Sequence, residues 1–510
     1  MTNPLYDTLF GRHEGKQTPF LHLPDGSTLS HADFLALSAR YANALADQGI
    51  APGDRVAVQV HKSPQALALY AACVRAGAVF LPLNTAYTAN ELDYFISNSG
   101  AGLFVCDGAS VQPLEPIAKA AGVGIQTLNA DGTGSLADLA AKASDRFAPV
   151  PRKADDLAAL LYTSGTTGRS KGAMLTHENL LSNAIALVSC WRFTDRDVLL
   201  HALPIFHSHG LFVATNVSLL AGGAMIFLPK FDQDAVMARL LQATTMMGVP
   251  TFYTRLLDDP RFTRDLTAHI RLFISGSAPL LAETHVRFEQ RTGHRILERY
   301  GMTETSMNSS NPYEGERRAG SVGFALPGVE IKITDPATGQ TLPDGDIGQI
   351  ELRGPNVFKG YWQMPEKTAE ELREDGFFIT GDLGLFDADG YLTIVGRNKD
   401  LIISGGYNIY PKEIELVLDE QPGVMESAVI GVPHPDFGES VVAVLVADPD
   451  QATPPDQEAI SAAVAEQLAG FKQPRKMIVV EALPRNTMGK VQKNVLRDEY
   501  GDIFTPVGTS

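Results

Sequence analysis

Short apolar runs alternate with longer amphipathic segments through the first half of the chain. Apolar positions such as Leu35, Leu37, Tyr41 and Leu45 predict an amphipathic helix over 30–48. The same reasoning predicts further helices over 63–76, 89–98 and 178–188, with Thr176 as an N-cap, and short strands over 55–60, 78–83, 103–106, 224–227, 246–249 and 271–274. Strands that alternate with helices predict an α/β fold with a largely parallel sheet covered on both faces.

The pattern changes near Val329. Apolar and polar residues alternate over 330–334 and 349–353 around a turn at 335–339, which predicts antiparallel strands and a small β-barrel. A further strand is predicted over 391–395. Beyond a glycine-rich segment, helices are predicted over 411–419 and 456–468 and strands over 427–430 and 441–446. We therefore predict a large N-terminal domain, 1–397, and a smaller, mobile α+β C-terminal domain, 398–510.

Length and charge narrow the classes of function. A chain of 510 residues is too long for one compact core. The formal net charge of -17 argues against a nucleic-acid partner, because such a partner requires a basic face. Three cysteines that lie far apart indicate a reducing compartment, and we expect the cytoplasm. The polar segment 1–16 predicts no signal peptide, and the apolar region 66–83, interrupted by Arg75 and glycine, predicts no membrane span.

A loop over 161–172 carries hydroxyl groups, glycines and two cations between two apolar runs. Glycines let backbone N–H groups turn toward an anion, and hydroxyls and a lysine add donors and charge. It is not a Walker A motif, because Lys171 is followed by Gly172 and not by Ser or Thr. The loop therefore joins two strands, either as a flap over phosphates or as a polar surface turn.

Four later segments combine glycine, charge and hydroxyl groups. In 300–305, Thr303 could donate to a phosphate, Glu304 could hold Mg²⁺ and Tyr300 could stack on a base. Asp382 follows a glycine, as ribose-binding carboxylates do. Arg397 could lie near phosphate or ribose, and 484–491 is a loop that carries Lys490. Each segment alone is also consistent with an ordinary turn.

Together these segments resemble the adenylate-forming superfamily of acyl-CoA synthetases, adenylation domains and luciferases. The matching motifs are 163–172, 300–304, 380–382, 396–406 and 484–490, in that order. Ser170 departs from the family, which usually has proline there. The resemblance implies two half-reactions: a carboxylate attacks the α-phosphate of ATP, and the thiol of coenzyme A then attacks the acyl-adenylate. Catalysis of this kind is mostly positioning and charge neutralisation.

The resemblance also assigns roles to residues of this chain. Lys490 matches the lysine that approaches the carboxylate and the α-phosphate, Thr303 would contact that phosphate, and Glu304 would hold Mg²⁺. Lys399 matches the hinge of the C-terminal domain. The remaining nucleotide and coenzyme A contacts would come from Thr163, Ser164, Gly165, Thr166, Thr167, Gly168, Lys171, Ser277, Ala278, Pro279, Tyr300, Gly301, Met302, Asp382, Arg397 and Gly406.

The acyl pocket is expected around Arg299, Ser277, His207 in segment 204–210, and the segment 248–255 with Arg255. A buried arginine is costly unless it is paired. A second carboxylate on the substrate is a ready partner, since a guanidinium can bind it with two hydrogen bonds. Within the superfamily, Arg299 and Arg255 look most like malonyl-CoA synthetases, and methylmalonate is a further expected substrate. The alternative is that Arg299 pairs with Glu298 or another acidic residue and that Arg255 lies on a helix surface.

Other functions stay open at this point. The acid could be oxalate, 4-coumarate or a medium-chain fatty acid, or the chain could be a stand-alone amino-acid adenylation domain. Such domains place an aspartate in the acyl pocket, where this chain has His207. A non-catalytic nucleotide-binding protein is a third class, which the presence of Lys490 and Glu304 argues against. A lysine on a mobile loop is also a target for acetylation, so an acetyltransferase and a deacetylase acting on Lys490 are expected partners.

Overall fold

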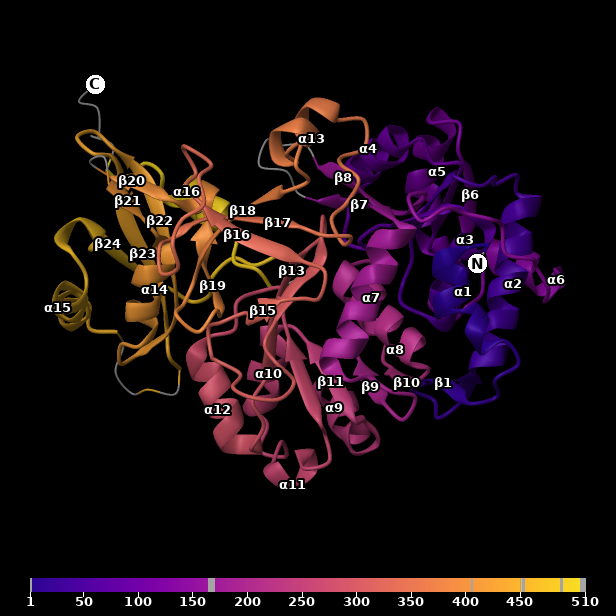
Figure 1. Ribbon diagram of the computed structural model, residues 1–510, viewed down its shortest axis with the longest axis horizontal. Coiled ribbons are helices and arrows are strands. Elements are labelled where there is room, and N and C mark those ends of the chain that lie inside the picture. The colour runs from indigo at the N-terminus through magenta and orange to yellow at the C-terminus, as the bar shows by residue number, and fades with distance from the viewer. Residues whose placement is uncertain are drawn as a thin grey trace. The chain divides into compact units, whose positions relative to one another are not determined.

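The computed structural model describes residues 2–163, 170–404, 407–449, 451, 455–486 and 489–504 (Figure 1). The chain divides into two compact units. The first comprises Met1–Ile331 and Leu352–Phe378, and the second comprises Lys332–Glu351 and Ile379–Ser510. The predicted domain boundary between residues 397 and 398 lies inside the second unit. The role of this region as a hinge stays a prediction.

The first unit contains a six-stranded sheet in the order β6-β5-β3-β4-β7-β8. All pairs are parallel except β7–β8, which is antiparallel. Ser30, Ser63 and Thr88 cap the helices that follow them. The strands are β3 (Arg55–Gln59), β4 (Val79–Pro82), β5 (Leu103–Cys106), β6 (Gly124–Thr127), β7 (Leu157–Thr163) and β8 (Lys171–Thr176). The associated helices are α2 (His31–Asp47), α3 (Pro64–Ala76), α4 (Ala89–Ser99), α5 (Val111–Ala120) and α6 (Ser135–Lys142).

The first unit also contains a nine-stranded sheet in the order β15-β14-β13-β12-β11-β9-β10-β1-β2. The pairs from β1 through β13 are parallel, whereas β14, β15 and β2 add antiparallel edges. The strands are β1 (Pro19–His22), β2 (Thr28–Ser30), β9 (Val198–His201), β10 (Ala224–Phe227), β11 (Thr245–Gly248), β12 (Leu272–Ser275), β13 (Leu297–Met302), β14 (Ser306–Ser310) and β15 (Phe324–Ala325).

Helices of the first unit cover this sheet, and α10 and α12 lie side by side (Figure 1). Their core is aromatic: Tyr253, Phe262, Phe273 and Phe288 are fully buried together. The helices are α1 (Pro4–Leu9), α7 (His177–Trp191), α8 (Asn216–Ala221), α9 (Gln233–Arg239), α10 (Pro250–Leu257), α11 (Arg264–Thr267), α12 (Ala282–Thr292) and α13 (Pro365–Glu371), and a π-helix spans His209–Thr215.

The second unit has a five-stranded sheet with a core on each face. Along β23, Val441, Ala443 and Leu445 belong to one hydrophobic cluster, and Val442 and Val444 belong to another. This alternation follows from the two-residue period of a strand. The elements are β20 (Ile402–Ser404), β21 (Tyr407–Ile409), β22 (Val424–His434), β23 (Gly438–Ala447), β24 (Lys476–Val480), α14 (Pro411–Asp419), α15 (Gln457–Gln467) and α16 (Lys493–Tyr500).

The predicted α/β class with a smaller C-terminal part is confirmed. The predicted elements 224–227, 330–334 and 411–419 coincide with β10, β16 and α14. The barrel-like region forms a four-stranded sheet of β16 (Glu330–Thr334), β17 (Gly348–Arg353), β18 (Phe378–Phe386) and β19 (Leu392–Arg397). Asp382 lies within β18 after Gly381, whose φ is +75°, so the alternative of an ordinary turn does not describe it. Within the described ranges, no helix is long and apolar enough to cross a membrane.

Candidate active site

The predicted phosphate loop connects β7 to β8, which pair antiparallel with Thr163 opposite Lys171. The prediction that this loop joins two strands is therefore confirmed. Ser164, Gly165, Thr166, Thr167 and Gly168 lie outside the described residues. The two ends of the hairpin place Thr163 and Lys171 beside a group of acidic and aromatic side chains of the first unit.

Lys171 is buried and paired. Its Nζ lies 3.0 and 3.2 Å from the two carboxylate oxygens of Glu371 and 4.1 Å from the centroid of the Tyr361 ring. Lys367 adds a second ion pair to Glu371 at 3.0 Å. Burial would raise the pKa of Glu371, but hydrogen bonds from Tyr361, Lys171 and Lys367 outweigh it and lower the pKa. Glu371 and Tyr361 were not assigned a role from the sequence, since their contacts appear only when distant segments fold together.

Glu304 follows β13 and is only 6% exposed. Its Oε1 lies 3.1 Å from the Tyr361 hydroxyl and 3.4 Å from Thr163 Oγ1. The single Tyr361 proton cannot serve two carboxylates, and the hydroxyl lies closer to Glu371, at 2.6 Å. Burial accordingly raises the pKa of Glu304, although the charge of Lys171 opposes the shift. Glu304 is therefore a buried carboxylate with weak hydrogen-bond donors.

Arg299, on β13, is 4% exposed. Its Nε and Nη2 are buried with no hydrogen-bond partner among the residues that the structure describes. Burial lowers the pKa of Arg299 to about 9. The neighbouring Glu298 contacts other groups: its Oε1 lies 3.4 Å from His285 Nδ1 and 3.3 Å from the backbone N of Gly320. Within the described residues, no hydrogen bond or ion pair joins Glu298 to Arg299, since successive strand residues point to opposite faces.

His207 and Ser277 lie near a third residue, His209, that the sequence analysis did not assign. The backbone N–H of His209 donates to His207 Nδ1 at 3.2 Å, and His209 Nδ1 lies 3.1 Å from Ser277 Oγ. Ser277 follows β12 and has φ of +73°, in the region that favours glycine. A non-glycine residue held there costs of order 1–3 kcal/mol and is typical of functional sites.

Expected nucleotide-binding residues follow one strand and end the next in the nine-stranded sheet. Ala278 and Pro279 continue the turn after β12, while Tyr300, Gly301 and Met302 form the last residues of β13. Tyr300 is buried and Thr303 lies half-buried in the following turn. In open α/β sheets, ligands bind beyond the carboxyl ends of the strands, which is where these residues lie. Their contacts with the nucleotide stay predictions.

Arg255 is an expected acyl-pocket residue of the first unit that the structure places on an exposed helix surface. It is exposed on α10, where Tyr253, two positions earlier, points into the core and donates its hydroxyl proton to the carbonyl of Ile274. Exposure is compatible with both the acyl-pocket role and the surface-helix alternative, so the role of Arg255 stays a prediction. The segment 248–255 that was expected to line the acyl pocket is mostly helix α10.

The second unit carries the remaining predicted residues. Arg397 Nε lies 3.0 Å from Asp382 Oδ1, so the two predicted ribose-binding residues form an ion pair. Lys399 is exposed in a short turn after β19, and Gly406 lies outside the described residues. The backbone N of Lys490 donates to Asn486 Oδ1 at 3.0 Å, and Asn486 N donates to the Lys490 carbonyl at 2.9 Å, which closes a tight loop at the lysine.

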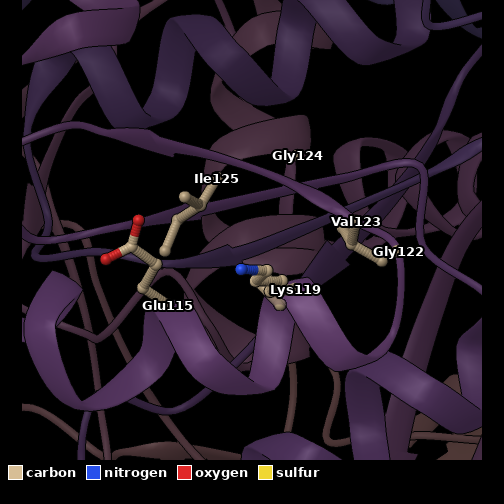
Figure 2. A pocket seen from close by; sticks show the side chains of 7 residues that line it. Glu115, Lys119, Gly122, Val123, Gly124 and Ile125 are labelled. Atoms are coloured by element: carbon tan, nitrogen blue, oxygen red, sulfur yellow. The ribbon is translucent and has the colours of Figure 1, made fainter.

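A surface hollow of about 390 Å³ lies elsewhere, between α5 and β6 (Figure 2). Glu115, Lys119 and Ile125 line it, and it contains none of the predicted site residues. Within the described part of the chain, no group of three or more His, Cys, Asp or Glu side chains is placed to hold a metal ion. Mg²⁺ does not need such a group, since one or two carboxylates and phosphate oxygens commonly bind it.

Two protein-family models match this chain. The family model of the AMP-binding enzyme matches residues 12–362, and that of the AMP-binding enzyme C-terminal domain matches 413–490. A malonate–CoA ligase from Arabidopsis thaliana is 35% identical over 480 residues, 88% of this chain and 78% of that protein. A feruloyl-CoA synthase from an Amycolatopsis species is 36% identical over 481 residues, 93% and 95% of the two chains.

Among solved structures, ATP-bound MatB from Rhodopseudomonas palustris is 58% identical, with a TM-score of 0.97 over 99% of this chain and 100% of that chain. The family model covers more than half of the sequence, and its residues include the β7–β8 hairpin, Arg299 and Glu304. The chain therefore belongs to the family of AMP-binding enzymes and is an AMP-forming acyl-CoA synthetase.

Proposed function

We propose that this enzyme forms malonyl-CoA from malonate, ATP and coenzyme A, with release of AMP and pyrophosphate. The observation that carries the proposal is Arg299, a buried guanidinium whose Nε and Nη2 lack partners among the described residues. An unpaired buried cation costs stability unless a ligand supplies the missing anion. A second carboxylate on a short acid supplies it. The similarity to a malonate–CoA ligase is consistent with this substrate.

The proposed reaction has two steps. A carboxylate oxygen of malonate attacks the α-phosphorus of ATP, and the bond to pyrophosphate breaks. The thiol of coenzyme A then attacks the acyl carbon, loses its proton and displaces AMP. Lys490 would offset the charge that accumulates in the first step, and Thr303 would donate to the α-phosphate. His207 would lie at the mouth of the acyl pocket, while the ion-paired Asp382 and Arg397 would hold the ribose.

Mg²⁺ fits the surroundings of Glu304. The carboxylate is buried, its pKa is raised by burial, and it shares the Tyr361 hydroxyl with Glu371. A bound cation would compensate that charge with the oxygen ligation that Mg²⁺ prefers. When bound, the ion would neutralise phosphate charge; Lys171 and the hairpin loop would hold the β- and γ-phosphates.

A pyrophosphate-release assay over a panel of acids tests the proposal. Malonate, methylmalonate, oxalate, 4-coumarate, octanoate and an amino acid are compared at matched ATP and coenzyme A. We expect malonate to give the highest kcat/KM, followed by methylmalonate, which has both carboxylates. A higher kcat/KM for a monocarboxylate or an amino acid would overturn the proposal.

Control of the enzyme through Lys490 is a second part of the proposal. Acetylation by a protein lysine acetyltransferase would remove the charge, and a deacetylase would restore it. Acetylated enzyme should lose adenylation while still forming thioester from supplied acyl-adenylate. Equal loss of both half-reactions would contradict this role. The proposal further includes rotation of residues 398–510 about Lys399. It also includes a cytoplasmic location, which rests on the cysteine pattern.

A further inference from the structure

His209 is a buried polar residue to which the proposed reaction assigns no role. It begins the π-helix His209–Thr215 and is 1% exposed. Its Nδ1 faces Ser277 Oγ at 3.1 Å, whereas its Nε2 is buried with no hydrogen-bond partner within the described ranges. A buried nitrogen left unpaired destabilises the fold, so its retention calls for an explanation. π-helical turns occur frequently at functional sites.

His209 and Arg299 belong to one cluster. After burial, the charge of Arg299 is the largest cause that lowers the pKa of His209. The guanidinium also lies against Gly276, next to Ser277: a Cβ added at Gly276 would lie 2.4 Å from Arg299 Cζ. The turn after β12 therefore contacts Arg299 through Gly276 and His209 through Ser277. We call these three residues, Arg299, His209 and Ser277, the acid-binding cluster.

The segment that carries His209 is held by a second set of contacts. Lys62 Nζ lies 2.7 Å from His201 Nδ1 and donates to the carbonyls of His201 and Leu203 at 2.8 and 2.9 Å. His201 Nε2 lies 2.8 Å from the Gly210 carbonyl, which can only accept, so Nε2 bears the proton. Nδ1 of the neutral ring must then accept, and Lys62 uses all three of its protons.

Gly210 itself permits the close approach on which this arrangement depends. A Cβ there would lie 2.1 Å from the Pro204 carbonyl oxygen, so a side chain would force the loop apart. His209 is thus held on one side by the Gly210 carbonyl, which is hydrogen-bonded to His201, and on the other side by Ser277. Binding groups held this way lose little conformational entropy when a ligand arrives.

We propose that His209 is a second hydrogen-bond donor for the distal carboxylate of the diacid, beside Arg299. Ser277 donates its hydroxyl proton to Nδ1, which leaves the ring proton on Nε2. That N–H and the free guanidinium N–H groups then meet the same carboxylate. Ser277 is a positioning residue, because it acts by fixing the tautomer of His209. This inference rests on the proposed function.

Two substitutions at one position separate the two nitrogens of His209. The amide of Gln can reach the position of Nε2, whereas the shorter Asn can reach only that of Nδ1. His209→Asn should therefore raise KM for malonate roughly tenfold to a hundredfold, the effect of losing one hydrogen bond to a charged group. His209→Gln should stay within about threefold of the unsubstituted enzyme. KM for ATP should not change in either variant.

Ser277→Ala provides a test that leaves the buried ring in place. Without the serine proton the ring can adopt the other tautomer, in which Nε2 would face the carboxylate as an acceptor. KM for malonate should rise about threefold to tenfold, with kcat changed less. Propionate lacks the distal carboxylate. In His209→Asn and Ser277→Ala its KM should therefore rise less than the KM for malonate.

The outcomes distinguish the inference from the function on which it rests. If the unsubstituted enzyme prefers a monocarboxylate, the proposed function fails and the His209 role fails with it. If malonate is preferred but His209→Asn or Ser277→Ala leaves its KM unchanged, the His209 role alone is wrong. Equal losses with malonate and propionate would also overturn it, because they would show a structural role only.

Discussion

Two buried charges of opposite sign lie on one short segment of the first unit. Arg299 is on β13 and Glu304 is in the turn that follows it; they are 4% and 6% exposed. Burial lowers the pKa of the arginine and raises that of the glutamate, so it disfavours both charged forms. Among the described residues, Arg299 retains N–H groups without a partner, and the side-chain hydroxyl donors to Glu304 are long or shared.

The pair Lys171 and Glu371 shows the contrasting case. The lysine contacts both carboxylate oxygens, and Lys367 and Tyr361 complete the surroundings of Glu371. A paired buried charge can be explained by the fold alone. An under-paired one would be stabilised by a ligand of the opposite sign, which we propose is an anion at Arg299 and a cation at Glu304. The comparison thus separates buried charges that lack a full set of partners in the fold from charges, such as Lys171, that already have one.

The largest expected effect is at Arg299. Arg299→Met keeps the volume but removes the charge, so kcat/KM for malonate should fall about 100-fold to 1,000-fold, since losing one partner of a buried charged pair costs roughly 3–5 kcal/mol. KM for ATP should change little. Arg295→Ala, which removes an exposed arginine paired with Glu289, is the matched control. An unchanged kcat/KM for malonate in Arg299→Met would show that Arg299 does not bind the anionic group of the substrate.

Glu304→Gln tests the cation side. The amide cannot supply the charge that Mg²⁺ requires, so ATP–pyrophosphate exchange should fall about 100-fold, and added Mg²⁺ should recover part of the loss. Glu370→Gln, at an exposed glutamate on α13, is the control. If the loss of exchange does not depend on Mg²⁺ concentration, Glu304 acts by some other route than the ion.

At Arg299, stability should change in the opposite direction from activity. Arg299→Met removes an unpaired buried cation, so the free energy of unfolding of the ligand-free enzyme should rise by about 1–3 kcal/mol. Lys171→Met leaves Glu371 without its main partner and should lower that free energy by a similar amount. Urea denaturation of the two variants measures both. Destabilisation in both would mean that Arg299 is paired in the native state.

How far the sequence could predict the site depends on separation along the chain. Periodicity located β10 and α14, and Thr176 caps α7 as predicted. The alternation of β13 could also have shown that Glu298 and Arg299 point to opposite faces. Contacts between distant segments gave no local signal. Lys171 and Glu371 are 200 positions apart in the sequence. Lys62 and His201 are separated by 139 positions, and His209 and Ser277 by 68 positions. The exposure of Arg255 could not be predicted either, because a motif shows a residue type but not the face of its helix.

The smallest expected effect is on pH dependence, where the two carboxylates should differ in sign. The pKa of Glu304 is raised above 4.5, so the fold favours its protonated form, and its contribution to stability is lost as pH rises from about 4.5 through the raised value. The pKa of Glu371 is lowered, so its contribution is present above about 4.5 and is lost as pH falls. Glu304→Gln should therefore raise the free energy of unfolding near neutral pH and Glu371→Gln should lower it, each changing the slope by up to about 1.4 kcal/mol per pH unit. Slopes that change in the same direction would show that both carboxylates are equally paired, and the contrast between them would fail.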